Sequence, residues 1–191
     1  MKGSLQATAS IILNFWFGEP GSSSYAQYKD FWFQSTPELD QQIRYQFESV
    51  YQKVIKGELD DLLQTPDGSL ALVILLDQFP RNMYRGTSQA FASDSKALMV
   101  AKKALEKKFD QNLLPLQKMF LYLPYEHSEN LEDQEKSVEL FKALGDETAL
   151  QYAIKHRDII AQFGRFPHRN IILGRKNTPK EMSFLKAKEN F

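Results

Sequence analysis

Three Thr-Pro pairs divide this sequence and constrain its fold more than any other feature. Thr36-Pro37, Thr65-Pro66 and Thr178-Pro179 each join a residue that caps a helix N-terminus to a proline that suits the first helical position. After the first pair, apolar residues repeat at helical spacing over residues 39–54. After the last pair, Glu181 stands where a capping box requires an acidic or amide side chain. The sequence therefore predicts a helix immediately after each pair.

Residues 70–76 are apolar on nearly every side and form the one segment that resembles a buried strand. Leu dominates the segment, β-branched residues are few and no hairpin turn follows, so we predict a central helix that ends before Pro80. Further helices are expected over residues 11–17, 94–109, 115–122, 130–144 and 146–163, with Pro124 closing the one that begins at Pro115. About eight helices without a strand predict an all-α fold, a single domain over residues 1–191 built of antiparallel packed helix pairs.

The balance of charges and the absence of cysteine exclude several classes of function. Lys and Arg together number 24, as do Asp and Glu, so no net charge indicates a nucleic-acid or anionic membrane partner. The chain has no Cys and therefore no disulfide, thiolate nucleophile, iron–sulfur cluster or Cys-ligated zinc. The apolar run 11–17 is too short for most signal peptides, and no segment is long enough to span a membrane. We expect a cytoplasmic protein without a cofactor, and the sequence leaves its oligomeric state open.

Two segments differ from ordinary helices and loops, because each places Phe-Pro closely before Arg-Asn. Residues 77–86 read DQFPRNMYRG, and residues 163–170 read FGRFPHRN, continuing to Arg175. A third segment, residues 123–129, places a carboxylate, an imidazole and a hydroxyl between two predicted helices. These three segments are where we expect a functional site.

The same segments make the chain resemble a family of bacterial proteins of unknown function with a tetratricopeptide-like all-α fold. The resemblance is carried by residues 12–18, 75–86, 123–129 with Gln134, and 156–175, and so covers nearly the whole chain. Two positions depart from the family pattern, since Asn14 and Asn130 stand where an acidic residue is usual. The resemblance implies the fold, with no established activity. No register of about 34 residues repeats the tetratricopeptide landmarks, so the sequence itself shows no such repeat.

One interpretation of these segments is an anion-binding pocket in a small-molecule binding protein or hydrolase. Arginine forks suit carboxylate or phosphate oxygens, and amides supply neutral contacts. Asp77 or Glu126 would act as general base, and His127 or His168 as general acid, on a phosphorylated or carboxylated compound. The predicted binding residues are Arg81, Asn82, Arg85, His156, Arg165, Arg169, Asn170 and Arg175.

The alternative interpretation is structural. Arg and His just after a helix bind its last free carbonyls and complement its dipole, which would make the chain a helical protein-interaction scaffold. The aromatic residues of 15–17 and 31–33 would then line a peptide groove or simply fill the core. A metal site is not predicted, because the three histidines do not have ligand spacing. The two interpretations differ in whether the arginines and histidines surround one cavity with unpaired side chains.

Overall fold

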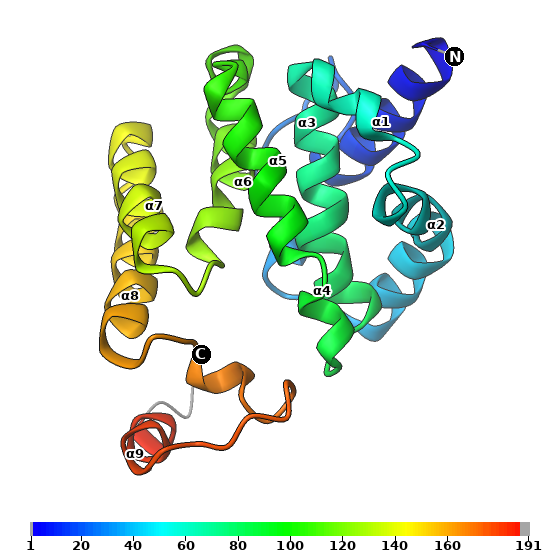
Figure 1. Cartoon of the computed structure of the whole chain (residues 1–191). Coiled ribbons are helices and arrows are strands. Elements are labelled where there is room, and N and C mark those ends of the chain that lie inside the picture. Colours follow the sequence, from blue (N-terminus) through cyan, green and yellow to red (C-terminus); the bar gives the residue numbers. More distant parts are fainter. Residues whose placement is uncertain (1, 188–191) are drawn as a thin grey trace.

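The structure of the chain is a computed structural model that describes residues 2–187. Nine α-helices and six short helical turns make up this part of the chain, and it contains no strand. The α-helices are α1 (Lys2–Phe17), α2 (Pro37–Ile55), α3 (Pro66–Val73), α4 (Phe79–Met83), α5 (Asp94–Glu106), α6 (Pro115–Glu126), α7 (Leu131–Leu144), α8 (Glu147–Phe163) and α9 (Pro179–Ala187). The all-α prediction is confirmed, and Figure 1 shows the helices packed side by side with α9 apart from the rest. The tetratricopeptide-like arrangement stays a prediction.

The helices after the three Thr-Pro pairs begin where the sequence predicts, because the caps form, whereas α1 begins at Lys2 and is longer than the helix expected over residues 11–17. Thr36 Oγ1 accepts a hydrogen bond from Leu39 N at 3.3 Å, and Thr65 Oγ1 accepts one from Gly68 N at 3.1 Å. At α9 the capping box is complete: Glu181 N donates to Thr178 Oγ1 at 3.2 Å, and Thr178 N donates to the Glu181 carboxylate at 2.6 Å. The side chains therefore satisfy amides that each helix start would otherwise leave unpaired.

Two predicted helix ends are wrong, both at prolines. The helix that begins at Pro66 does not stop before Pro80 but continues through a π-helical turn, η3 (Ile74–Gln78), directly into α4. Pro80 lies in the first turn of α4, where a missing N–H is tolerated. Pro124 lies inside α6, which continues to Glu126. Burial of both segments holds them helical in spite of the lost backbone hydrogen bonds.

The helix predicted over 94–109 is also shorter than expected. It ends at Glu106, and the backbone turns at Lys108, which has a φ of 56° in the left-handed region. A short turn, η5 (Phe109–Asn112), leads from there to α6.

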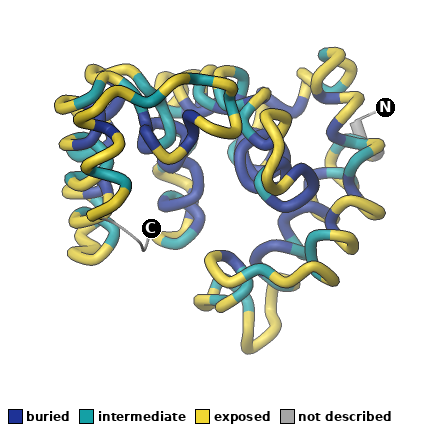
Figure 2. The backbone as a smooth tube through the Cα atoms, turned by 90° about the horizontal axis from the view of Figure 1, so that it is seen from below, coloured by how far each residue is buried: buried dark blue, intermediate teal, exposed yellow. Residues whose placement is uncertain are grey.

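The core lies around α3, η3 and α4, whose residues are buried almost without interruption (Figure 2). Phe79 packs against Phe47 and Trp16 with ring centroids 4.5 Å and 5.5 Å apart, and Trp16 packs against Phe120 at 5.6 Å. These rings come from α1, α2, α4 and α6, so one aromatic cluster joins four helices. Most of the predicted aromatic groove is therefore core, and among its residues Phe33 is prominently exposed.

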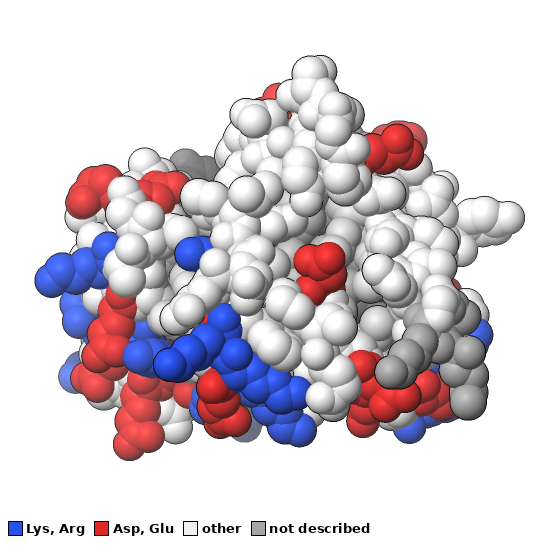
Figure 3. Space-filling model, turned by 90° about the horizontal axis from the view of Figure 1, so that it is seen from above, with Lys and Arg blue, Asp and Glu red and all other residues white. Residues whose placement is uncertain are grey.

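The C-terminal part brings the chain from α8 back to α5 and the end of α6. After α8 the segment 164–178 runs beneath α7 and α8 toward the end of α4, and it contains the short turn η6 (Pro167–Arg169) (Figure 1). In the face shown in Figure 3, acidic and basic side chains mix along one edge and much of the surface is uncharged, as expected from the balanced composition. None of the described helices has the length and apolar character needed to cross a bilayer.

Candidate functional site

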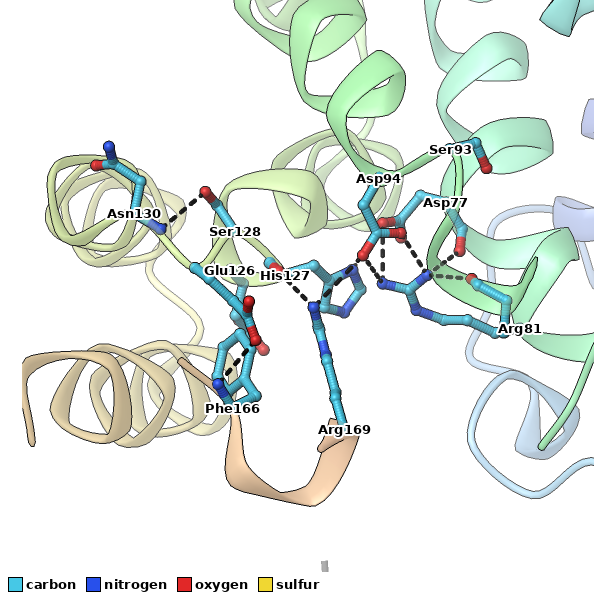
Figure 4. A network of polar contacts seen from close by, with 12 residues as sticks. Asp77, Arg81, Ser93, Asp94, Glu126, His127, Ser128, Asn130, Phe166 and Arg169 are labelled. Atoms are coloured by element: carbon cyan, nitrogen blue, oxygen red, sulfur yellow. Dashed lines mark hydrogen bonds and ion pairs between the residues drawn. The ribbon is translucent and has the colours of Figure 1, made fainter. Parts of the chain in front are cut away.

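The polar residues of the three unusual segments meet where η3, α4, α5, α6 and η6 come together (Figure 4). At the centre is Asp77, which is fully buried in the π-helical turn. Arg81 lies one turn further along, with its Nη2 at 3.4 Å from Asp77 Oδ1 and its Nη1 at 2.9 Å from Asp94 Oδ1. Arg81 therefore lies between two carboxylates, and the helical backbone sets its distance from one of them.

Asp77 is held in its ionised form. Burial alone would raise the pKa of its carboxyl, but Arg81 and His127 together outweigh burial and hold that pKa well below its usual range. The charge on Asp77 is consequently present at neutral pH. This charge fixes the positions of Arg81, His127 and Gln78, whose side chains contact it.

His127 is the C-cap of α6, and its ring contacts the same carboxylate. Nδ1 of His127 lies 2.7 Å from Asp77 Oδ1. Because an ionised carboxylate only accepts, Nδ1 carries the hydrogen and Nε2 carries the lone pair. Burial lowers the pKa of His127 below 6.5 in spite of the opposing effect of Asp77, so the ring is neutral at pH 7. Nε2 makes no hydrogen bond within the described residues.

Glu126 and His156 form a second acid–imidazole pair beside the first. His156 Nδ1 lies 3.2 Å from Glu126 Oε1 and 2.9 Å from the carbonyl oxygen of Tyr152, so Nδ1 carries the hydrogen here too. Burial, together with the nearby charge of Asp77, raises the pKa of Glu126 to about 8. Burial lowers the pKa of His156 to about 4. At neutral pH this pair is a carboxylic acid beside a neutral imidazole.

These groups face a cavity of 570 Å³, which we call the aromatic cleft. Gln78, Arg81, Glu126, His127 and His156 supply much of its polar lining. The rest is mainly aromatic and aliphatic and comes from the segment 28–33 and from α6, α7 and α8: Tyr28, Trp32, Phe33, Leu116, Met119, Leu123, Phe141, Ala149 and Tyr152, with Asp146 and Thr148. A concave, largely apolar cavity with a few convergent polar groups is typical of small-molecule sites.

A second cavity, of 310 Å³, shares only His127 with the aromatic cleft, and we call it the arginine pocket. Its walls are Ser88, Phe91, Ala92, Asp94, Ser95, Leu98, Pro124, His127, Ser128, Glu129, Arg169, Leu173 and Arg175. Arg169 is 6% exposed, and its guanidinium carbon lies 4.4 Å and 4.9 Å from the ring centroids of Phe166 and Phe91. Its Nη1 donates to the His127 carbonyl at 3.1 Å and lies 3.5 Å from Asp94 Oδ2.

Several of the predicted site residues lie outside both cavities. Arg85 and Asn82 both donate to Asp40, at 2.6 Å and 2.8 Å, on the side of α4 that faces α2. His168 is exposed and lines neither cavity.

The end of the chain holds its own polar contacts. Arg165 pairs with Glu181 at 2.7 Å and so fastens the start of α9. Asn170 donates to Asn177 at 2.7 Å. Arg175 lines the arginine pocket, but its guanidinium is paired with Glu129 at 2.8 Å. The structure thus brings together Asp77, Arg81, Glu126, His127, His156 and Arg169, and it places Asn82, Arg85, Arg165, His168 and Asn170 elsewhere.

Sequence reasoning missed two contributors. Asp94 contacts both Arg81 and Arg169, but from the sequence it is an ordinary acidic residue in the first turn of a helix. Gln78 donates to Asp77 and lines the aromatic cleft, and the sequence signal that indicates it is an amide beside an acid at the end of a continuous apolar run. Among the residues that the structure describes, no group of three or more His, Asp or Glu side chains is arranged to hold a metal ion.

Comparisons with known proteins place the chain in a family. A comparison with curated proteins gave no match. A solved structure of a protein of unknown function from Agrobacterium tumefaciens is 37% identical to this chain, with a TM-score of 0.86, and the match covers 95% of this chain and 98% of that one. A family model described as bacterial protein of unknown function (DUF924) matches residues 12–189. The chain therefore belongs to this DUF924 family of bacterial proteins of unknown function.

Proposed function

We propose that the chain is an enzyme that binds a small, largely apolar molecule in the aromatic cleft and acts on it by general acid–base catalysis. One observation carries the proposal: His127 is oriented through Nδ1 by the buried, ionised Asp77, while its Nε2 has no hydrogen-bond partner among the described residues. His127 lines the cleft. A neutral imidazole held this way is a general base.

Glu126 supplies the matching acid. Its side chain lines the same cleft, and a carboxyl with a pKa of about 8 keeps its proton at neutral pH. Proton transfer in two directions requires one group that is protonated and one that is not. Here the different environments of Glu126 and His127 move their pKa values apart and provide both. This assigns Asp77 the task of orienting the base, because its fully buried carboxylate touches no cavity.

Hydrolysis is the favoured reaction, because it needs only a water molecule besides the acid and the base. His127 Nε2 would take a proton from a water molecule as that water attacks a carbonyl carbon, and Glu126 would give its proton to the leaving atom. A serine nucleophile is not favoured, because Ser128 Oγ donates to Asp133 at 2.8 Å. We infer a neutral ester or amide with an aromatic or aliphatic body as the substrate class, since the cleft's lining is mainly apolar.

The lining of the aromatic cleft does not favour a strongly anionic substrate. Arg81 is the one arginine that lines it, and Arg81 is already paired with Asp77 and Asp94. The ion pairs of Arg85 and Arg165 favour structural roles for those two residues, as the scaffold interpretation expects. That interpretation gives no reason for the free Nε2 of His127.

The first experiment is a thermal-shift screen of neutral aromatic and aliphatic esters and amides. Compounds that stabilise the wild type are then tested against Thr148→Trp, which places a large ring in the cleft, and against Ala143→Trp, an exposed site on α7 outside the cleft. We expect the stabilisation to be lost in the first variant and kept in the second, because ligand binding stabilises only a protein that retains the site.

Hydrolysis of the stabilising compounds is then followed by incorporation of ¹⁸O from labelled water into the acid product. His127→Gln keeps a hydrogen-bond donor for Asp77 but has no basic nitrogen, so kcat should fall by about 10²–10⁴ while binding persists. Absence of any ligand that distinguishes the two tryptophan variants would contradict binding in the cleft. Equal rates for wild type and His127→Gln would contradict the catalytic role.

A further inference from the structure

Arg169 is buried with an incomplete set of hydrogen bonds. Among the described residues, only Nη1 of its guanidinium has partners, the His127 carbonyl and the Asp94 carboxylate. Nε is sealed within the protein and has no acceptor. Nη2 also makes no hydrogen bond within the described residues, but it is not among the sealed atoms. A buried donor without an acceptor is destabilising, and more so when it is charged, so this arrangement needs a reason.

The stacking of Arg169 holds it in this arrangement. Phe166 and Phe91 lie on the guanidinium with centroids 4.4 Å and 4.9 Å from Cζ, which fixes the plane of the group beside the arginine pocket. Burial, together with the nearby Arg81, lowers the pKa of Arg169 to about 10, in keeping with its incomplete set of hydrogen bonds. Asp94, the nearest carboxylate, is shared with Arg81.

We propose that the arginine pocket is a second small-molecule site, for a short-chain carboxylate whose oxygen accepts from Arg169 Nη2. The apolar tail would lie against Phe91, Leu98 and Leu173, which line the pocket beside the polar wall. This site shares only His127 with the aromatic cleft, and its proposal does not depend on the proposed enzymatic function. Its volume of 310 Å³ lies at the small end of ligand cavities, which suits a ligand of a few carbons.

The charges around the pocket favour a monoanion over phosphate. Asp94 and Glu129 also line it, and although each is paired with an arginine, both would repel a second negative charge. A single carboxylate completes the partners of Arg169, whereas a dianion adds a charge that no free cation in the walls compensates. Butyrate is therefore the probe, and 1-butanol and inorganic phosphate are the comparisons.

The experiment is an NMR titration of the full ¹⁵N-labelled chain, following the Arg169 Nε–H signal at constant ionic strength. We expect a saturable shift with butyrate, and apparent affinities at least tenfold weaker for 1-butanol and for phosphate. Ser95→Trp, which fills the pocket from α5 without removing a described side-chain contact, should abolish the saturation. Met99→Trp, an exposed site on the same helix outside the pocket, should leave it unchanged.

Two further variants separate the outcomes. Arg169→Lys lacks the Nε–H signal, so it is followed by the backbone amide signals of the pocket walls; it should lose butyrate binding, and if that variant does not fold, Ser95→Trp decides. Thr148→Trp fills the aromatic cleft and should bind butyrate like the wild type, so this proposal and the proposed function fail independently. A response to butyrate that matches sodium chloride, or that 1-butanol reproduces, would overturn the site, and tighter binding of phosphate would overturn the assignment to carboxylates.

Discussion

Replacing Glu126 with Gln should remove a pH dependence of stability that the wild type carries. The pKa of Glu126 rises from 4.5 to about 8 on folding, because burial and the charge of Asp77 disfavour the carboxylate. A raised pKa means that the folded protein holds the proton more tightly than the unfolded chain does. This stability is fully present below pH 4.5 and is lost as the pH rises through about 8.

The size of the effect follows from the same values. At about 1.36 kcal/mol per pH unit, the difference between 4.5 and 8 corresponds to roughly 5 kcal/mol in total. Roughly 3–4 kcal/mol of this is lost between pH 5 and pH 8. The remainder falls outside this range, because the unfolded chain is already partly ionised at pH 5 and the folded protein is only half ionised at pH 8. A domain with a free energy of unfolding of about 5–15 kcal/mol will show that loss clearly. Gln has the same shape, still offers an oxygen to His156 Nδ1, and does not titrate.

The measurement is urea unfolding at a series of pH values, followed by the fluorescence of the buried Trp16 and Trp32. The wild type should lose stability relative to Glu126→Gln as the pH rises from 5 to 8. The matched control is Glu135→Gln, an exposed site on α7, which should run parallel to the wild type. Parallel curves for wild type and Glu126→Gln would mean that Glu126 ionises normally in the folded state, and would refute its assignment as an acid at neutral pH.

Three other predictions follow from the structure. Gly68→Ala should destabilise the chain by about 1–3 kcal/mol in urea, because a Cβ there collides with the carbonyl oxygen of Leu62, and an unchanged midpoint would contradict this packing. For a hydrolysed substrate, kcat/KM should rise as His127 loses its proton below pH 6.5 and fall as Glu126 ionises near pH 8, whereas a flat profile would exclude this pair. Hydrogen bonds from an arginine and a backbone amide lower the pKa of Glu181 to about 2, so the protection factors of the α9 amides, measured against intrinsic exchange rates, should fall as the pH falls from 4.5 toward 2. Glu181→Gln should remove that dependence, and its persistence would refute the role of this carboxylate.

Most helix starts were predictable from the sequence because a cap is a local interaction. Thr36, Thr65 and Thr178 bond amides three residues away, so the sequence contains the donor and the acceptor together. The ends at Pro80 and Pro124 were not predictable in the same way. Whether a proline breaks a helix depends on how firmly the surrounding helices bury the segment, and that burial is a property of the whole fold.

The candidate site was predictable as a set of segments and not as a set of contacts. The three motifs do meet, but the arginines divide between site and structure according to which carboxylate lies nearby. Arg85 and Asp40 are 45 positions apart in the sequence, and Arg165 and Glu181 are 16 apart, so no local pattern reveals either pair. Asp77 and Arg81, one turn apart on a helix, are the exception, because helical spacing alone brings them together.

The position of Asp77 in the central π-helical turn has a consequence for the motions of the site. The turn packs against α1, α2, α5 and α6, so it cannot open unless the contacts among these helices open with it. Amide exchange at Asp77 should then report the global unfolding equilibrium rather than a local fluctuation. Segments 18–35 and 164–178 each border one of the two cavities, and most of their residues are not buried, so opening them breaks fewer core contacts than opening the turn does. Ligand entry and release should therefore be governed by these two segments, while the carboxylate that orients His127 keeps its place throughout.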